Sequence, residues 1–478
     1  MSTSGSRVSR WLSAYLGKVL IVVVVPAMYV VYQGFDFVPG QQPDSDKCVG
    51  DIGEELSRHG HSEELLWRGC LIASDTVRHL PRFIPGRDIM KSSPDTTDVP
   101  SCVSCHDGEA APTFARMWTR FPRYNERTGR VEDLAQAIQD EIELRYGGVR
   151  PNRSDNAITA LYFYAAAKAA QSGLRFQIED AADEPLPAVQ LSSQAPTQDC
   201  RAKFEQMGWP KGPNAEGVIR GCNLITETQQ NVRGLLARIW RTDLDCQSCH
   251  LEAGDKSHAG SMADAAVVLP VMHTASNQPI RFDRRVLLCF THSLNWYDLG
   301  SDARDITYIN MYANWLAQKK DLPIGRLPEG RGIPVLHEAA GRGASFLAGE
   351  KVYKDYCKAC HGASGLGGAG PIFRGREPPP IAGPHAFSAA ASLADRNRIA
   401  GFVYANMPYG ATMEHPVLTL QQALDVSAYL TSLGRPADFT RVNQLRVFFD
   451  HLWLKVVASL GNFISGFTND KRAGEPGA

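Results

Sequence analysis

The sequence has no surplus of charge of either sign. Its 478 residues include 50 Lys and Arg against 51 Asp and Glu, which gives a formal net charge of −1. Proteins that bind nucleic acids carry a basic surface, so this balance argues against a nucleic-acid partner. The 44% hydrophobic and 21% charged residues are those of an ordinary globular protein,. At roughly 150 residues per domain, the length allows about three domains.

Cysteine is the informative residue type, because six of the 11 cysteines lie in three C-x-x-C-H motifs. The motifs are Cys102/Cys105/His106, Cys246/Cys249/His250 and Cys357/Cys360/His361. This pattern attaches haem c through two thioether bonds and supplies the histidine as an iron ligand. Chance would give roughly 0.01 such motifs in a chain like this one. A thioredoxin-like pair or half a zinc site does not call for the histidine, so we expect three covalently attached haem c groups.

The other five cysteines are Cys48, Cys70, Cys200, Cys222 and Cys289. Haem c is attached outside the cytoplasm, in a compartment where disulfides also form. The first two and the next two are each 22 residues apart, which favours the disulfides Cys48–Cys70 and Cys200–Cys222. Cys289 is left over, and an odd cysteine in an exported protein calls for a function.

The N-terminus contains a long apolar run, residues 11–32, after a polar start with two arginines. About 20 apolar residues can span a bilayer, and the basic flank keeps that end in the cytoplasm. The alternative is a signal peptide cleaved near Ala27, but the apolar run continues beyond that point,. We therefore expect a membrane anchor over residues 1–40, in the inner membrane, with the haem domains in a bacterial periplasm.

The next two segments form an internal duplication. Cys48 and Cys70 map onto Cys200 and Cys222 with a constant offset of 152. After the haem motifs a constant offset of 148 relates Pro122 to Pro270, Thr159 to Thr307, Tyr164 to Tyr312 and Ala165 to Ala313. Each copy ends in a predicted helix, 157–170 and 306–317, and a linker-like stretch covers 179–198. We expect cytochrome c-like domains at 41–180 and 199–320.

A third cytochrome c-like domain is predicted at 339–438, after a joint rich in Pro and Gly. Val352, Tyr353 and Tyr356 lie on one face of a helix that runs into Cys357. A second helix has Ala423, Val426, Leu430 and Leu433 at steps of three and four,. The predicted fold is thus all-α, with three cytochrome c-like domains behind an N-terminal transmembrane helix.

The C-terminal segment, 439–478, lacks an uninterrupted apolar run. Residues 443–467 are predicted to form an amphipathic helix with an apolar stripe, and Arg446, Asp450 and Lys455 argue against a membrane span. The helix either packs on the third domain or lies in the membrane interface or on a partner.

The sixth iron ligand of the third haem is expected to be Met407, which precedes Pro408 in a loop. A core methionine is the alternative, and Met413 is the second candidate. For the second haem we expect Cys289 as the distal ligand. Arg281, Arg284 and Arg285 would favour its thiolate and an anionic substrate,.

Other interpretations of the second site are a buried free thiol, or His292, Met272 or His273 as the ligand. In the first copy, the offset of 148 replaces Cys289 by Glu141, Arg285 by Ala137 and Ser293 by Arg145. Its distal candidates are Met117, Met90 and His79. A copy that keeps its haem and loses these polar groups suits electron relay rather than chemistry.

Residues from about 200 to 438 resemble the dihaem thiosulfate dehydrogenases. The likeness rests on the segment Cys289–Asn295, on Arg285 before it and Ser293 within it, on Asn406-Met407-Pro408 and on the run 425–436. A weaker likeness links the chain to the dihaem cytochrome of the periplasmic sulfur-oxidation pathway. The chain departs from the pattern in its extra haem unit, in Trp296 where the family has Gly, and in the loop 387–393.

The resemblance implies that two thiosulfate anions meet near Cys289, held by Arg285 and Ser293. Loss of two electrons would join them as tetrathionate, with Cys289 as a displaced ligand or a covalent sulfur carrier. The electrons would leave through the His361/Met407 haem to an acceptor cytochrome or membrane redox complex.

Two other functions compete with this one. The anchor, the C-terminal helix and the extra haem favour a purely electron-transferring subunit of a membrane respiratory or photosynthetic complex. A carrier that holds a sulfur compound on Cys289 for a partner needs the same cysteine. Cys289 with Arg285 and Ser293 favours the enzyme, because electron transfer alone needs no substrate pocket.

Overall fold

The computed structural model describes residues 48, 63–84, 101–106, 112–180, 195–232, 242, 244–273, 278–294, 304–337, 343–372 and 376–437. The chain divides into two units, Met1–Asp51 and Ile52–Ala478, and all described residues except Cys48 belong to the second. The expected anchor (1–40) and C-terminal helix (439–478) lie outside the described residues. Among the described residues, no helix has the length and apolar character needed to cross a membrane.

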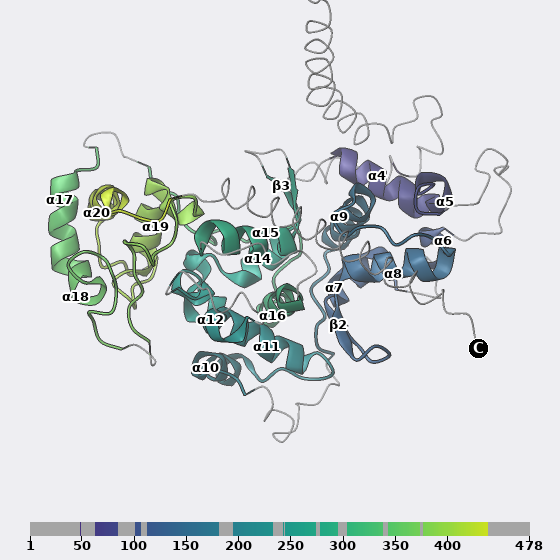
Figure 1. Cartoon of the computed structure of the whole chain (residues 1–478), viewed down its shortest axis with the longest axis horizontal. Coiled ribbons are helices and arrows are strands. Elements are labelled where there is room, and N and C mark those ends of the chain that lie inside the picture. Colours follow the sequence, from purple (N-terminus) through teal and green to yellow (C-terminus); the bar gives the residue numbers. More distant parts are fainter. Residues whose placement is uncertain are drawn as a thin grey trace, which may run out of the picture. The chain divides into compact units, whose positions relative to one another are not determined.

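Helices account for most of the described chain (Figure 1). The first copy contains α4 (Glu63–Ser74), α5 (Thr76–His79), α6 (Cys102–His106), α7 (Phe114–Arg120), β1 (Arg123–Asn125), β2 (Arg130–Glu132), α8 (Leu134–Tyr146) and α9 (Asn156–Gln171). The second contains α10 (Gln198–Met207), α11 (Ala215–Thr226), α12 (Thr228–Asn231), η5 (Cys246–Ser248), α13 (Leu251–Gly254), η6 (Ser257–Ala259), α14 (Met262–Val268), β3 (Val271–His273), β4 (Gln278–Ile280), α15 (Phe282–Leu288), η7 (Cys289–Ser293) and α16 (Arg304–Lys319). The third contains α17 (Phe346–Val352), η8 (Tyr353–Cys357), α18 (Lys358–His361), η9 (Ser392–Ala394), α19 (Arg396–Asn406) and α20 (Leu420–Ser432).

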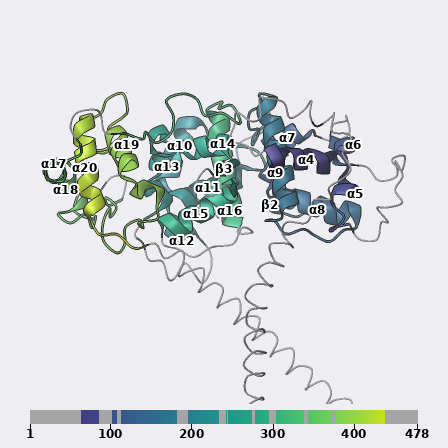
Figure 2. The same cartoon turned by 90° about the horizontal axis from the view of Figure 1, so that it is seen from above.

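Each of the three segments is built on one pair of crossing helices: α4 with α9, α11 with α16, and α17 with α20 (Figures 1 and 2). A glycine lies at each crossing, and a Cβ atom there would collide with a backbone carbonyl of the partner helix. The glycines are Gly69, Gly221 and Gly349, and they face the Cβ atoms of Tyr164, Tyr312 and Tyr429. Only a residue without a side chain allows so close an approach of two backbones.

The prediction of an all-α fold missed two short antiparallel hairpins. Arg123 pairs with Glu132 in the first, and Val271 pairs with Ile280 in the second. Arg123 and Val271 are 148 positions apart, so the hairpins occupy equivalent places in the two copies. The duplication therefore extends to loops whose three-residue strands are too short for sequence periodicity to reveal.

The predicted helices that end the two copies are present and slightly longer than expected, at α9 and α16. In the third segment, Ala423, Val426 and Leu430 are buried against Val352 and Tyr353. The prediction for Tyr356 was wrong, because this side chain is 38% exposed. The helix is wound as a π-helix from Tyr353, which rotates Tyr356 off the apolar face,.

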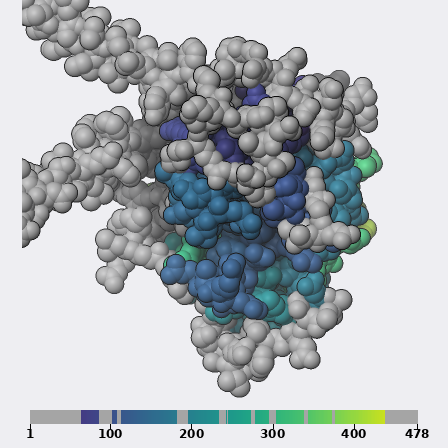
Figure 3. All heavy atoms as spheres, turned by 90° about the vertical axis from the view of Figure 1, so that its right-hand side faces the viewer, coloured from purple at the N-terminus to yellow at the C-terminus, as the bar shows by residue number. Residues whose placement is uncertain are grey.

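The first two copies meet at a buried cluster of four charged residues. Arg153 contacts Asp133, and its Nε lies 3.1 Å from Oδ2 of Asp283. The Arg281 guanidinium lies 2.7 Å from the same oxygen. All four side chains are less than a tenth exposed. Asp133 caps α8 and Asp283 lies in the first turn of α15, so the cluster fixes two equivalent helices to each other. The face of the first copy is seen in Figure 3.

Candidate redox site

A threonine holds the first cysteine of two of the C-x-x-C-H motifs. The Cys246 backbone donates to Thr228 Oγ1 at 2.9 Å, and the same hydroxyl lies 3.3 Å from the Cys246 sulfur. Thr76 makes the same two contacts with Cys102, at 2.9 and 3.1 Å. These threonines were not predicted, although the offset of 152 that relates Cys48 and Cys70 to Cys200 and Cys222 also relates Thr76 to Thr228.

The histidine of each motif is oriented by a backbone carbonyl. Nδ1 of His106, His250 and His361 lies 2.8, 2.5 and 2.9 Å from the carbonyl oxygens of Pro112, Gly260 and Pro379. A carbonyl can only accept, so each Nδ1 carries the proton and each Nε2 keeps the lone pair that binds a metal. Burial lowers the pKa of His250 and His361, which keeps these rings neutral. The three motifs therefore fit the proximal side of a covalently bound haem.

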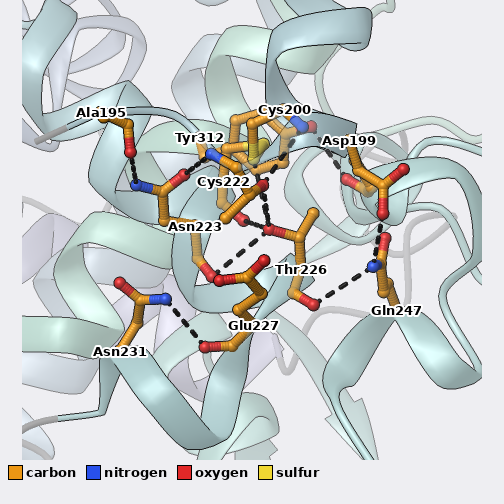
Figure 4. The surroundings of a disulfide bond; sticks show 12 residues. Ala195, Asp199, Cys200, Cys222, Asn223, Thr226, Glu227, Asn231, Gln247 and Tyr312 are labelled. Carbon is orange, nitrogen blue, oxygen red and sulfur yellow. Dashed lines mark hydrogen bonds between the residues drawn. A yellow bond between two sulfur atoms is a disulfide. The ribbon is translucent and has the colours of Figure 1, made fainter. Parts of the chain in front are cut away.

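A disulfide joins the two helices that contact the second motif (Figure 4). Cys200 and Cys222, which we expect to pair, are bonded with their Cα atoms 5.9 Å apart. Gln247, inside the motif, donates to Asp199 at 2.8 Å and to the Thr226 carbonyl at 3.2 Å. The bonded helices α10 and α11 thus hold the middle of the motif. Cys48 and Cys70 are also each disulfide-bonded.

A cavity of about 400 Å³ adjoins the third motif. Cys357, Cys360 and His361 line one side of it, and Met407 also faces it. Of the two methionines predicted as ligands, Met407 lines the cavity and Met413 does not. A mostly apolar cavity with an imidazole and a thioether on its walls fits a haem with His and Met as axial ligands.

The same cavity is bounded by residues of the second motif. Ser248, Cys249 and Leu251 line it together with the third-motif residues. Asn406, next to Met407, donates to the His258 carbonyl at 3.0 Å, two residues before the Gly260 carbonyl that orients His250. The second and third motifs therefore adjoin one another.

Cys289 begins a π-helical turn, η7, at the end of α15. Its side chain is close enough to Cys246 and Cys249 to interact electrostatically with both, and Arg285 interacts with both Cys289 and His250. Ser293 ends the same turn. The structure thus brings Cys289 and Arg285 to the second motif, as the sequence predicts, with Ser293 one turn away. π-Helical turns of this kind are frequent at functional sites.

The expectation that three arginines favour the Cys289 thiolate was wrong for two of them. Arg281 is buried and bound to Asp283 and the Arg153 carbonyl. Arg284 is exposed on the surface of α15. Burial raises the pKa of the Cys289 thiol and Arg285 offsets this only in part, so a metal ion would have to supply the remaining stabilisation of a thiolate.

Among the alternative distal ligands of the second site, Met272 packs against Leu66, Phe163 and Ala167 in the core of the first copy. His292 lies in η7, three residues beyond Cys289. The side chain of His273 and all of Trp296 lie outside the described parts of the chain.

The first copy places other groups where the second has Cys289. Glu141 on α8 interacts electrostatically with Cys102, and Arg145 interacts with Cys105. Glu141 and Arg145 are bound to each other one helical turn apart. Met117 lies on α7, which starts two residues after Pro112, whose carbonyl orients His106. His79 Nε2 is buried without a hydrogen-bond partner, and Met90 lies outside the described residues.

Comparison with known proteins identifies two domains. Residues 346–434 match the cytochrome c family, and residues 86–172 match the cytochrome c domain of SoxA/TsdA. The second match lies in the first copy, outside residues 200 to 438, whose sequence resembles the dihaem thiosulfate dehydrogenases. The first copy is therefore a cytochrome c domain related to the same family.

Several curated relatives are thiosulfate dehydrogenases. That of Thiomonas intermedia is 31% identical over 41% of this chain and 60% of its own length. Those of Stutzerimonas stutzeri and Allochromatium vinosum are 28% and 29% identical over 48% of this chain and 71% and 81% of theirs. The chain thus spans about three fifths of the Thiomonas relative.

Among the solved structures that are similar to this chain, two are described. Thiosulfate dehydrogenase (TsdBA) from Marichromatium purpuratum aligns with a TM-score of 0.42 at 25% identity, over 70% of this chain and 67% of that one. SoxXA from P. pantotrophus aligns with a TM-score of 0.34 at 14% identity, over 59% and 84%. The sequence matches show that this protein contains cytochrome c domains and is a homologue of the thiosulfate dehydrogenases.

Proposed function

We propose that this protein is a periplasmic trihaem cytochrome that oxidises thiosulfate at the second haem motif. The observation that carries the proposal is the position of Cys289 and Arg285 beside Cys246, Cys249 and His250. A cysteine sulfur with a cation nearby suits a small sulfur anion that carries two negative charges. The named homologues support the same substrate.

In the proposed reaction, two thiosulfate ions lose one electron each and join through a new sulfur–sulfur bond to give tetrathionate. Arg285 would offset the repulsion between the two anions, and Ser293 would bind an oxygen of one of them. Covalently bound haems would supply the one-electron acceptors. The wall shared by the second and third motifs gives the electrons a short route to the site of His361 and Met407.

The remaining components of the proposal are an N-terminal anchor in the inner membrane and an acceptor cytochrome or membrane redox complex. The first site, with His106 and the Glu141–Arg145 pair, would relay or store electrons. These parts rest on the sequence pattern of residues 1–40 and on the three attachment motifs.

The test is to add thiosulfate to the oxidised protein and follow the haem α-band, in the parent and in Cys289→Ala. We expect rapid reduction in the parent and its loss in the variant. A parent that thiosulfate does not reduce, although a small artificial donor does, would overturn the enzymatic function. That outcome would leave a purely electron-transferring subunit.

A further inference from the structure

The turn that carries Cys289, η7, ends at Ser293. In a helix the last carbonyls have no partner within the helix and need donors from elsewhere. Here the Leu294 backbone donates to the Cys289 carbonyl at 3.0 Å, which closes the π-turn. The carbonyls of His292 and Ser293 come next.

Both of these carbonyls accept from one residue of the third domain, Ser388. Its hydroxyl donates to the His292 carbonyl and its backbone N–H to the Ser293 carbonyl at 3.3 Å. The Ser388 side chain is almost fully buried, with 1% exposure. One serine therefore caps the end of the helix that carries Cys289, across a sequence distance of 96 residues.

The loop around Ser388 is fixed at several points. The Ala389 backbone donates to the Pro436 carbonyl at 2.9 Å, and Thr242 Oγ1 of the second domain donates to the His385 carbonyl at 2.8 Å. The Arg435 guanidinium lies 4.6 Å from the centre of the Phe387 ring. Phe387 lines the cavity of the third motif. Adjacent residues thus face the third haem site and the Cys289 turn.

We propose that Ser388 is a positioning residue for Cys289, so that the third cytochrome domain completes the substrate site as well as carrying electrons away from it. The inference rests on the proposed function for the role of Cys289. Loss of the Ser388 hydroxyl removes this hydrogen bond to the His292 carbonyl and weakens the connection between the loop and the turn. The sulfur then spends less time at the distal position of the second haem.

The test compares Ser388→Ala with Ser388→Thr in the full-length oxidised protein. Electron paramagnetic resonance and near-infrared magnetic circular dichroism report thiolate ligation of iron without any substrate. In Ser388→Ala, the ratio of thiolate-ligated iron to iron without the thiolate should fall roughly fivefold, which is the usual contribution of one hydrogen bond to an equilibrium. Ser388→Thr keeps a hydroxyl and should restore most of it.

Ser432→Ala is the matched control, because this exposed serine also donates to a carbonyl, that of Tyr429 within its own helix. It should leave the thiolate signal unchanged. The spectrum of the third haem checks that each variant has folded. Should Ser388→Ala fail to fold, Thr242→Val loosens the same loop from the other side and should shift the signal in the same direction.

A thiolate signal in Ser388→Ala and Thr242→Val equal to that of the parent would overturn the inference. A parent with no thiolate signal at all would instead contradict the assignment of Cys289 as a ligand. A parent with the signal but without thiosulfate oxidation would contradict the proposed function alone.

Discussion

The first and second copies share a scaffold and differ in the residues of one helix. Both have a threonine bound to the first motif cysteine, a carbonyl bound to the motif histidine and a glycine at the helix crossing. The helix near the motif carries Glu141 bound to Arg145 in the first copy, and it carries Arg285 and leads into Cys289 in the second. The contacts of the motif and the packing of the crossing helices are therefore common to both copies, whereas the side chains of this one helix differ.

The largest expected effect is the difference between substitutions on the two equivalent helices, at Cys289 and at Glu141. We expect Cys289→Ala to slow the reduction of haem by thiosulfate on the order of 1,000-fold or more, as removal of a nucleophile does in other enzymes. Glu141→Ala should change that rate less than about twofold, because the Glu141–Arg145 pair is exposed and weak,. Stopped-flow absorbance of both variants measures the contrast. Equal losses in the two variants would mean that both sites take part in the chemistry.

The next prediction tests whether the buried charged cluster stabilises the contact between the first and second copies. Asp283→Asn removes the negative charge that pairs with the buried Arg153 and Arg281. This substitution should lower the free energy of unfolding by roughly 3–5 kcal/mol. The control Asp140→Asn removes an exposed ion pair with Arg150 and should cost less than about 1 kcal/mol,. Urea denaturation followed by circular dichroism gives both values. Similar small losses would show that the buried cluster does not join the domains.

A shared feature should respond alike in all three domains. Alanine at Gly69, Gly221 or Gly349 places a Cβ against a backbone carbonyl of the crossing helix, which should cost about 1–3 kcal/mol at each site,. Gly434→Ala is the control, because nothing lies within 4 Å of its Cβ position. Thermal unfolding of the four variants would show whether one crossing tolerates what the others do not.

The smallest effect is a dependence on pH. Burial opposes ionisation of Asp283, but Arg281 and Arg153 outweigh it and lower its pKa from 3.8 to about 2. A carboxyl with a lowered folded-state pKa adds stability above its unfolded pKa and loses it as the pH falls through the folded value. The folded state should therefore lose about 2 kcal/mol between pH 4 and pH 2, from roughly two pKa units. Acid titration of Asp283→Asn should lack this component.

Much of the candidate site could be predicted from the sequence because its chemistry depends on residue type and short spacing. The three attachment motifs, the pair Cys200–Cys222, and the nearness of Cys289 and Arg285 to the second motif follow from counting positions. The role of Arg281 could not be predicted in this way. Its partner Asp283 is two residues away, but burial of the pair depends on Arg153, 128 positions earlier.

By itself, the sequence determined the chemical groups and the repeat. The haem attachment motif consists of five consecutive residues, and a constant offset relates equivalent residues of the two copies. The tertiary structure alone decided which side chains face one another across domains. Ser388 reaches the Cys289 turn, and the second motif forms a wall of the third cavity, because helices far apart in sequence pack through their buried faces. Such contacts depend on the three-dimensional packing of the whole chain, which local spacing does not encode.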